Sequence, residues 1–268
     1  MNPSLVTTKI EENIAIVTLN RADKHNALNL DMFKAIRATI KSLKKNKTIR
    51  AVIVQGDGVD FCTGLDVKSV MGKVSNFIAL LFKWRPGKAN LAQYVSTGWQ
   101  EIPVPVIMVL HGRVWGGGLQ IALGGDFRIA HPETTLSVLE ARWGLVPDMG
   151  GTLALKEQLP ADKAKLLAMT GREISAKQAQ KLNLITKVSE VPVEAAMALA
   201  QEISAQSPDS VAAVKKLYKN AWWHSKAFAL ARESWYQIKI IQGKNQGIKT
   251  RNQLNPEQAK PFKQRSNW

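Results

Sequence analysis

The feature that most constrains the fold is a series of short apolar strands that end in glycine. Residues 51–56 (AVIVQG) and 103–112 (PVPVIMVLHG) each predict a buried strand closed by a glycine. Residues 29–46, which precede the first of these strands, repeat apolar side chains at helical spacing. Alternation of strands and helices along a chain is typical of α/β layering. The first half of the sequence therefore predicts an α/β fold.

Shorter strands accompany this pattern. Residues 5–10 and 14–19 are two alternating apolar segments joined at Glu-Glu-Asn, and they predict a β-hairpin. Residues 127–130 and 135–139 predict two further short strands.

Two helix starts carry capping residues. Ser175 and Gln178 have the spacing of a capping box. Ser207 followed by Pro208 is typical of an N-cap with proline at the first helical position.

The C-terminal part of the chain is expected to be helical. Residues 207–224 and 226–243 predict consecutive helices, and the polar, proline-marked tail 252–268 is expected on a surface or against a neighbouring subunit. We therefore predict a mixed core over residues 1–205 and a helical module over residues 206–268.

Composition narrows the class of protein. The 268 residues carry a formal net charge of +16, so nucleic acid, an anionic membrane surface and a multiply phosphorylated small molecule are all candidate partners. No apolar run is long enough to span a bilayer, and the N-terminal residues lack the pattern of a signal peptide. The single cysteine, Cys62, cannot form an internal disulfide, which favours a cytoplasmic location.

Two glycine turns predict a site for a negatively charged oxygen. Residues 61–66 (FCTGLD) and 111–119 (HGRVWGGGL) could each expose backbone N–H groups at the start of a helix. Two such donors that converge on one point are what an oxyanion needs, and Gly117 would permit close approach of a substrate oxygen. The alternative is a tight strand-to-helix turn without a ligand, and the glycines match no dinucleotide or Walker pattern.

Two carboxylates flank a Gly-Leu-Val-Pro turn further along the chain. Glu140 follows an apolar strand, and Asp148 precedes glycines that should open a helix. These side chains could face one cavity and divide the roles of acid and base. Alternatively, Asp148 caps the following helix, and Glu140 pairs with Arg142 or Arg128.

The order of these motifs resembles the crotonase superfamily, which includes the enoyl-CoA hydratases and isomerases. The matching stretches run in family order over about residues 5–190, at 19–29, 50–70, 103–130, 136–152 and 167–179. The resemblance implies a crotonase-like ββα superhelix, that is, a spiral of repeated ββα units, followed by a helical module. It also implies assembly as a homotrimer or as a hexamer made of two trimers.

The resemblance implies roles for individual residues. Leu65 and Gly117 fall where backbone N–H groups form the oxyanion hole of the family, which would stabilise the enolate of a thioester. The residues at positions that line the CoA and pantetheine path are His25, Ala27, Gly64, Leu65, Asp66, Val67 and Gly117. An acyl-CoA thioester is therefore the expected partner. CoA is part of that substrate, and we expect no other cofactor and no metal, since the histidines lack metal-ligand spacing.

Gln120 bears on the type of reaction. In the hydratases, this position and that of Glu140 both carry glutamate, and the two hold and activate a water. An amide cannot accept the proton of that water. Asp148 coincides with an aspartate that dienoyl-CoA isomerases use beside the glutamate, although those enzymes also have aspartate at the position of Gln120. The pattern of Gln120, Glu140 and Asp148 favours an enoyl-CoA or dienoyl-CoA double-bond isomerase.

Two alternatives to the isomerase remain. One is an enoyl-CoA hydratase with a rearranged site. The other is a basic nucleic-acid-binding protein on the same scaffold, which the net charge of +16 suggests. Against nucleic acid, the sequence has no aromatic and basic cluster like that of a known nucleic-acid module.

The resemblance places the acyl pocket between residues 67 and 100. Apolar segments and Trp84 and Trp99 lie in this region, and Trp115 and Trp143 flank the catalytic stretches. An aromatic, fatty pocket is the functional interpretation of these residues, but for any single tryptophan an ordinary core position is favoured.

Overall fold

A computed structural model describes residues 4–221 and 223–268. The strands are β1 (Val6–Glu11), β2 (Ile14–Leu19), β3 (Ala51–Gly56), β4 (Val106–Leu110), β5 (Arg113–Trp115), β6 (Phe127–Ala130), β7 (Thr135–Ser137), β8 (Glu173–Ser175) and β9 (Lys187–Val188). The helices are α1 (Leu30–Lys45), α2 (Val67–Met71), α3 (Val74–Leu81), α4 (Leu91–Thr97), α5 (Gly117–Leu123), α6 (Gly151–Gln158), α7 (Ala161–Thr170), α8 (Ala176–Lys181), α9 (Pro192–Ser204), α10 (Pro208–Ala221), α11 (Lys226–Ile241) and α12 (Lys244–Leu254).

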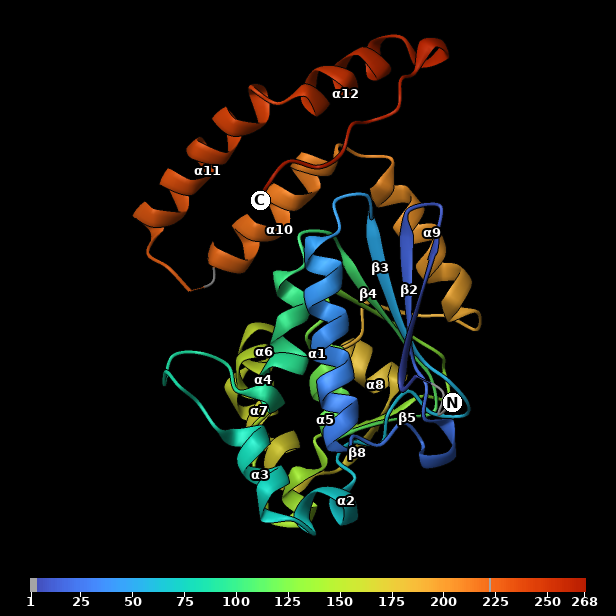
Figure 1. The fold of residues 1–268 in the computed structure, drawn as a ribbon, viewed down its shortest axis with the longest axis vertical. Coiled ribbons are helices and arrows are strands. Elements are labelled where there is room, and N and C mark those ends of the chain that lie inside the picture. The colour runs from blue at the N-terminus through green and yellow to red at the C-terminus, as the bar shows by residue number, and fades with distance from the viewer. Residues whose placement is uncertain (1–3, 222) are drawn as a thin grey trace.

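The strands form two sheets. The larger has the order β1-β2-β3-β4-β6-β9, in which β1 is antiparallel to β2 and the other neighbours are parallel. The smaller has the order β5-β7-β8, with β5 parallel to β7 and β8 antiparallel to it. The two sheets and their helices make up the core from which the last three helices extend (Figure 1).

Helices cover both faces of the larger sheet. Successive residues of a strand point to opposite faces, so Val52 of β3 joins one apolar cluster and Ile53 joins another. α1 packs its apolar stripe into the first cluster. α9 places Ala196 and Ala200 in the second, and these small side chains let the helix approach the sheet closely.

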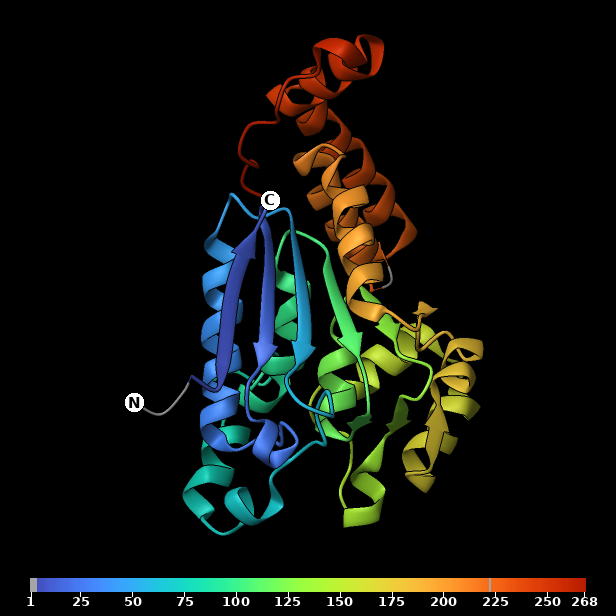
Figure 2. The ribbon, with the colours of Figure 1, turned by 90° about the vertical axis from the view of Figure 1, so that its right-hand side faces the viewer.

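The helices α10, α11 and α12 form an arm that projects from one end of the core in both ribbon views (Figure 2). Lys215 of α10 joins the arm to the core, because its Nζ lies 2.6 Å from Asp126 Oδ2 and donates to the carbonyl oxygen of Val104 at 2.9 Å. The C-terminal tail then packs back against the core of the same chain, because Arg265 donates to the carbonyl oxygen of Asn46. α9 ends at Ser204 and α10 begins at Pro208. The division into residues 1–205 and 206–268 remains a prediction.

Most predicted elements are confirmed, with corrections at their ends. The hairpin, the helix after Asn29 and the capping box of Ser175 are present. Within the strand predicted over 103–112, only the residues of β4 form a strand. The helix predicted over 207–224 ends at Ala221, and Trp222 lies outside the described residues.

Two local predictions at the C-terminal end are corrected. α10 begins at Pro208, but the predicted cap is wrong, because the buried Ser207 Oγ has no hydrogen-bond partner in the described part of the chain. The tail predicted over 252–268 begins within α12, which continues to Leu254. No helix among the described residues is long and apolar enough to cross a membrane.

Candidate active site

Two glycine turns from distant parts of the sequence lie side by side. The N–H of Trp115 donates to the carbonyl oxygen of Cys62 at 3.0 Å. A Cβ at Gly118 would overlap that same oxygen, and a Cβ at Gly64 would lie 3.2 Å from Gly117 N. Glycine is therefore required at both positions, because only a chain without Cβ atoms allows this approach.

The turns bring the two predicted oxyanion donors together. Leu28 holds the first turn, because its N–H donates to Gly64 O and its carbonyl accepts from Asp66 N. The Leu65 N–H, which lies between them, has no acceptor among the described residues. Gly117 is the first residue of α5, so its N–H has no partner within the helix. Both donors are therefore available to a ligand, as an oxyanion hole requires.

Glu140 lies beside this pair. It is carried by the 3₁₀ helix Leu139–Trp143, directly after β7. The Gly116 N–H donates to Ser137 O, and a Cβ at Gly116 would lie 3.4 Å from Glu140 Oε1. Gly116 has φ 51°, in the left-handed region, where glycine carries no steric penalty. This turn therefore sets α5 and the carboxylate next to each other.

The Glu140 carboxyl is buried and only partly hydrogen-bonded. The residue is 9% exposed, and Oε2 has no hydrogen-bond partner within the described residues. Burial raises the pKa of Glu140, and the charge of Asp148 adds to the rise, while the hydrogen bond from Gln120 opposes it. A carboxyl with a raised pKa is suited to exchanging a proton near neutral pH.

Gln120 connects Glu140 to the start of α6. Its Nε2 donates to Glu140 Oε1 at 2.6 Å. Its Oε1 accepts from the N–H groups of Met149 and Gly151, both at 2.9 Å. Both the nitrogen and the oxygen of the amide are thus hydrogen-bonded to the protein. The sequence did not predict its bonds to the start of α6.

Three of the alternatives drawn from spacing are wrong. Asp148 does not cap α6, because Gln120 accepts from the N–H groups at that end and the helix has no side-chain cap. Arg142 pairs with Glu173 rather than with Glu140. Arg128 donates to the carbonyl oxygens of Leu184 and Gly125.

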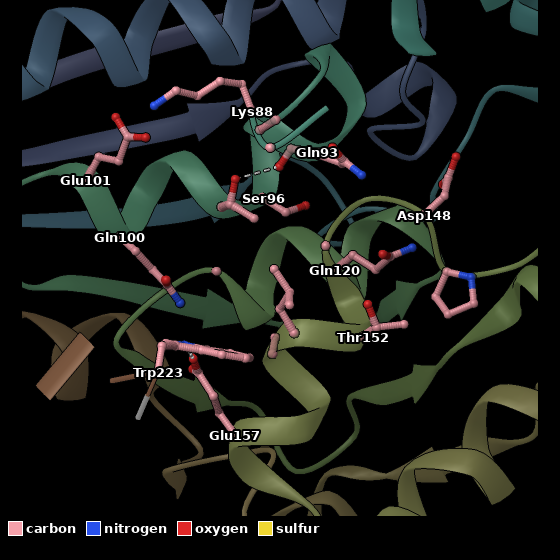
Figure 3. A pocket seen from close by; sticks show the side chains of 18 of the residues that line it. Lys88, Gln93, Ser96, Gln100, Glu101, Gln120, Asp148, Thr152, Glu157 and Trp223 are labelled. Atoms are coloured by element: carbon pink, nitrogen blue, oxygen red, sulfur yellow. Dashed lines mark hydrogen bonds between the residues drawn. The ribbon is translucent and has the colours of Figure 1, made fainter. Parts of the chain in front are cut away.

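Asp148 lines a cavity of about 620 Å³ together with Gln120. Figure 3 shows these two residues at one end of the cavity. The Asp148 side chain is exposed and has no hydrogen bond to another described residue, and partial desolvation raises its pKa while a hydrogen bond to its own backbone opposes the rise. The charge of Asp148 contributes to the raised pKa of Glu140, so the two carboxylates lie near enough to interact electrostatically.

The residues predicted to line the CoA path also gather around these turns, but several are held by the protein itself. His25 Nδ1 lies 2.9 Å from Asp60 Oδ2, which also pairs with Arg113 at 2.7 Å. The carbonyl oxygen of Ala27 accepts from Arg21, a contact absent from the sequence reasoning.

Asp66 and Val67 open the next helix. The Asp66 carboxylate pairs with Arg21 and caps α2, which begins at Val67. Among the described residues, no three His, Cys, Asp or Glu side chains gather where they could hold a metal ion.

The four tryptophans do not gather around the cavity of Gln120 and Asp148, although Ile78, Phe82 and Trp84 line a separate cavity within the predicted region. The core position expected for a single tryptophan is confirmed for Trp99. Trp84 is 91% exposed and Trp143 is 60% exposed, Trp99 is fully buried in the core, and Trp115 donates to Thr135 Oγ1. The lining of the cavity of Gln120 and Asp148 is instead rich in polar side chains: Lys83, Lys88, Gln93, Ser96, Thr97, Gln100, Glu101, Gln120, Asp148, Thr152, Glu157 and Lys219.

Comparison with known proteins identifies the family. A family model described as enoyl-CoA hydratase/isomerase matches residues 9–261. The chain belongs to this family. The predicted membership of the crotonase superfamily and the predicted α/β fold are both confirmed.

Individual members of the enoyl-CoA hydratase/isomerase family show the same likeness. The Bacillus subtilis (strain 168) protein YngF, named for this family, is 32% identical over 219 residues, which are 80% of this chain and 81% of that protein. A crystal structure of enoyl-CoA hydratase from Bacillus anthracis matches with a TM-score of 0.87 and 24% identity, covering 97% of this chain and 99% of that one. Enoyl-CoA hydratase EchA1 from Mycobacterium marinum matches with a TM-score of 0.84 and 25% identity over 97% and 98% of the two chains.

Proposed function

We propose that this member of the enoyl-CoA hydratase/isomerase family is a double-bond isomerase that acts on an enoyl-CoA or dienoyl-CoA thioester. The N–H groups of Leu65 and Gly117 would bind the thioester oxygen. Glu140 and Asp148 would exchange protons with the acyl chain. Gln120 would orient Glu140 through its 2.6 Å hydrogen bond.

The proposed reaction moves one proton out of the acyl chain and one proton in. Ionised Glu140 takes a proton from a carbon of the chain, and the electron pair of the broken C–H bond moves toward the thioester oxygen as an enolate. The Leu65 and Gly117 donors stabilise that charge. The enolate then forms a C–H bond at another carbon with the proton of Asp148. Desolvation raises both carboxyl pKa values, and the charge of Asp148 adds to the rise at Glu140. These shifts support a pair that shares one proton.

The observation that carries the proposal is the use of the Gln120 amide. Its oxygen accepts from two backbone N–H groups and its nitrogen donates to Glu140. An amide cannot accept a proton from a water, and both ends of this one are already hydrogen-bonded to the protein. Asp148, by contrast, offers a carboxylate in the same cavity.

Binding of CoA belongs to the same proposal. His25, Ala27 and residues 64–67 surround the oxyanion turns, where the pantetheine arm would pass. CoA enters as part of the substrate, and no further cofactor takes part in the proposed steps. We also propose a homotrimer, or a hexamer of two trimers, as the assembled form.

Hydration is the second candidate, and the names of the matched structures favour it, since they are enoyl-CoA hydratases. Incubation with a panel of enoyl- and dienoyl-CoAs, followed for both bond migration and water addition, separates the two functions. We expect migration to dominate, and Asp148→Asn to lower it by at least about 10²-fold. Hydration without any migration across the panel would reject the isomerase.

A further inference from the structure

The cavity that begins at Gln120 and Asp148 leads to a polar end. In Figure 3, Lys88, Gln100 and Glu101 lie on the side of the cavity away from Asp148, and Trp223 lies on that side as well. An acyl chain whose thioester lies at the oxyanion turns would enter beside Gln120 and extend toward this end. A hydrocarbon tail would strip water from polar side chains there without replacing their hydrogen bonds, which is unfavourable.

Lys219 of α10 is a cation at this polar end. It lines the main cavity and also a smaller neighbouring cavity that Gln100 and Glu101 share. The side chain is half-buried, and it has no ion pair or hydrogen bond to any described residue. Burial lowers the pKa of Lys219, and the nearby charge of Glu101 opposes that shift. By contrast Lys215, one helical turn earlier, is paired with Asp126.

The acidic side chains at the same end are already paired with other residues of the protein. Lys44 Nζ lies 2.7 Å from Glu101 Oε2. Trp223 Nε1 donates to Glu157 Oε1 at 2.6 Å. The charge of Glu101 also acts on Lys219 and raises its pKa, but the close contact of that carboxylate is with Lys44, so Lys219 makes no ion pair of its own within the described residues.

We propose that the acyl group of the substrate carries a carboxylate at its far end and that Lys219 binds it. The inference rests on the proposed function, because it places the thioester at Leu65 and Gly117. Lys219 acts on specificity: it contacts the far end of the acyl chain and takes no part in proton transfer. The exposed Lys83 and Lys88 add positive charge along the same cavity.

Binding of unreactive substrates tests this without relying on turnover. The probes are three saturated straight-chain acyl-CoAs of matched length that end in a methyl, a hydroxyl or a carboxylate, titrated by calorimetry. We expect the carboxylate to bind at least about tenfold more tightly than the methyl, as a charge-assisted hydrogen bond would provide. Lys219→Met should remove that preference and leave the affinity for the methyl-ended probe unchanged or improved. Lys216→Met, on the same helix but outside the main cavity, should keep it.

Each outcome has a distinct meaning. Equal affinity for all three probes, or a preference for the carboxylate that survives in Lys219→Met, would overturn the inference while leaving the isomerase proposal intact. Tightest binding of the hydroxyl-ended probe would overturn the carboxylate assignment. If no acyl-CoA binds to the folded wild-type protein, the proposed function itself fails.

Discussion

At the scale of single residues, Glu140 combines a chemical role with a cost in stability. Because burial raises its pKa, the neutral acid is stabilised in the folded protein relative to the unfolded chain. The stabilisation that comes from the neutral form is complete at pH values below the pKa of the unfolded chain. It is lost as pH rises through the higher pKa of the folded chain. The active, ionised form is therefore the less stable one.

Glu140→Gln tests this coupling. We expect kcat to fall by at least about 10²-fold, since glutamine cannot exchange the proton. The melting temperature should equal or exceed that of the wild type at neutral pH and converge with it in acid. Wild-type kcat should decline as pH falls through the raised pKa. Glu133→Gln, at an exposed position, is the matched control. A loss of less than about threefold would assign the carboxyl a purely structural role.

At the scale of elements, Gln120 joins α5 to α6 and to the 3₁₀ helix that carries Glu140. Replacing it with methionine leaves the N–H groups of Met149 and Gly151 without their acceptor at a buried helix start. We expect Gln120→Met to lower the free energy of unfolding by about 1–3 kcal/mol. It should also shift the pH dependence of kcat upward, because the Gln120 hydrogen bond lowers the Glu140 pKa.

Denaturant unfolding and a pH profile measure the two effects. Gln100→Met is the control: its side chain lines the same cavity but has no hydrogen bond within the described chain. Unchanged unfolding in Gln120→Met would contradict the proposed link between the helices.

The same elements show which features were predictable. The hairpin, the helix after Asn29 and the capping box of Ser175 follow from patterns within a few residues, and each was predicted. Gln120 instead bonds to groups 20, 29 and 31 positions away, for which no local pattern exists. Asp148 has the local features of a helix cap, but a buried side chain from another helix takes the place of that cap. The sequence did not predict the polar cavity for the same reason, because the cavity is assembled from α4, α5, α6, α10 and the loops between them.

At the scale of the whole molecule, the arm leaves apolar surface exposed. α11 presents Leu230, Trp235, Ile238 and Ile241, each at least half exposed, on the outside of the chain. Exposed apolar surface of this kind is typical of protein–protein interfaces. The resemblance to the crotonase superfamily implies a trimer, and we propose that the exposed apolar side chains of α11 contact a second copy of the chain.

Trp235→Asp tests this interface. Trp235 is 61% exposed, so the change removes little internal packing, but it would place a charge in a buried contact between copies. Light scattering after size-exclusion chromatography should give three or six times the 29.6 kDa chain mass for the wild type and a lower mass for the variant. Gln237→Asp adds the same charge to an exposed polar position on the same helix and should leave the mass unchanged. Circular dichroism checks that both variants fold. A wild type that elutes as a monomer, or an assembled Trp235→Asp variant, would show that α11 does not carry the interface.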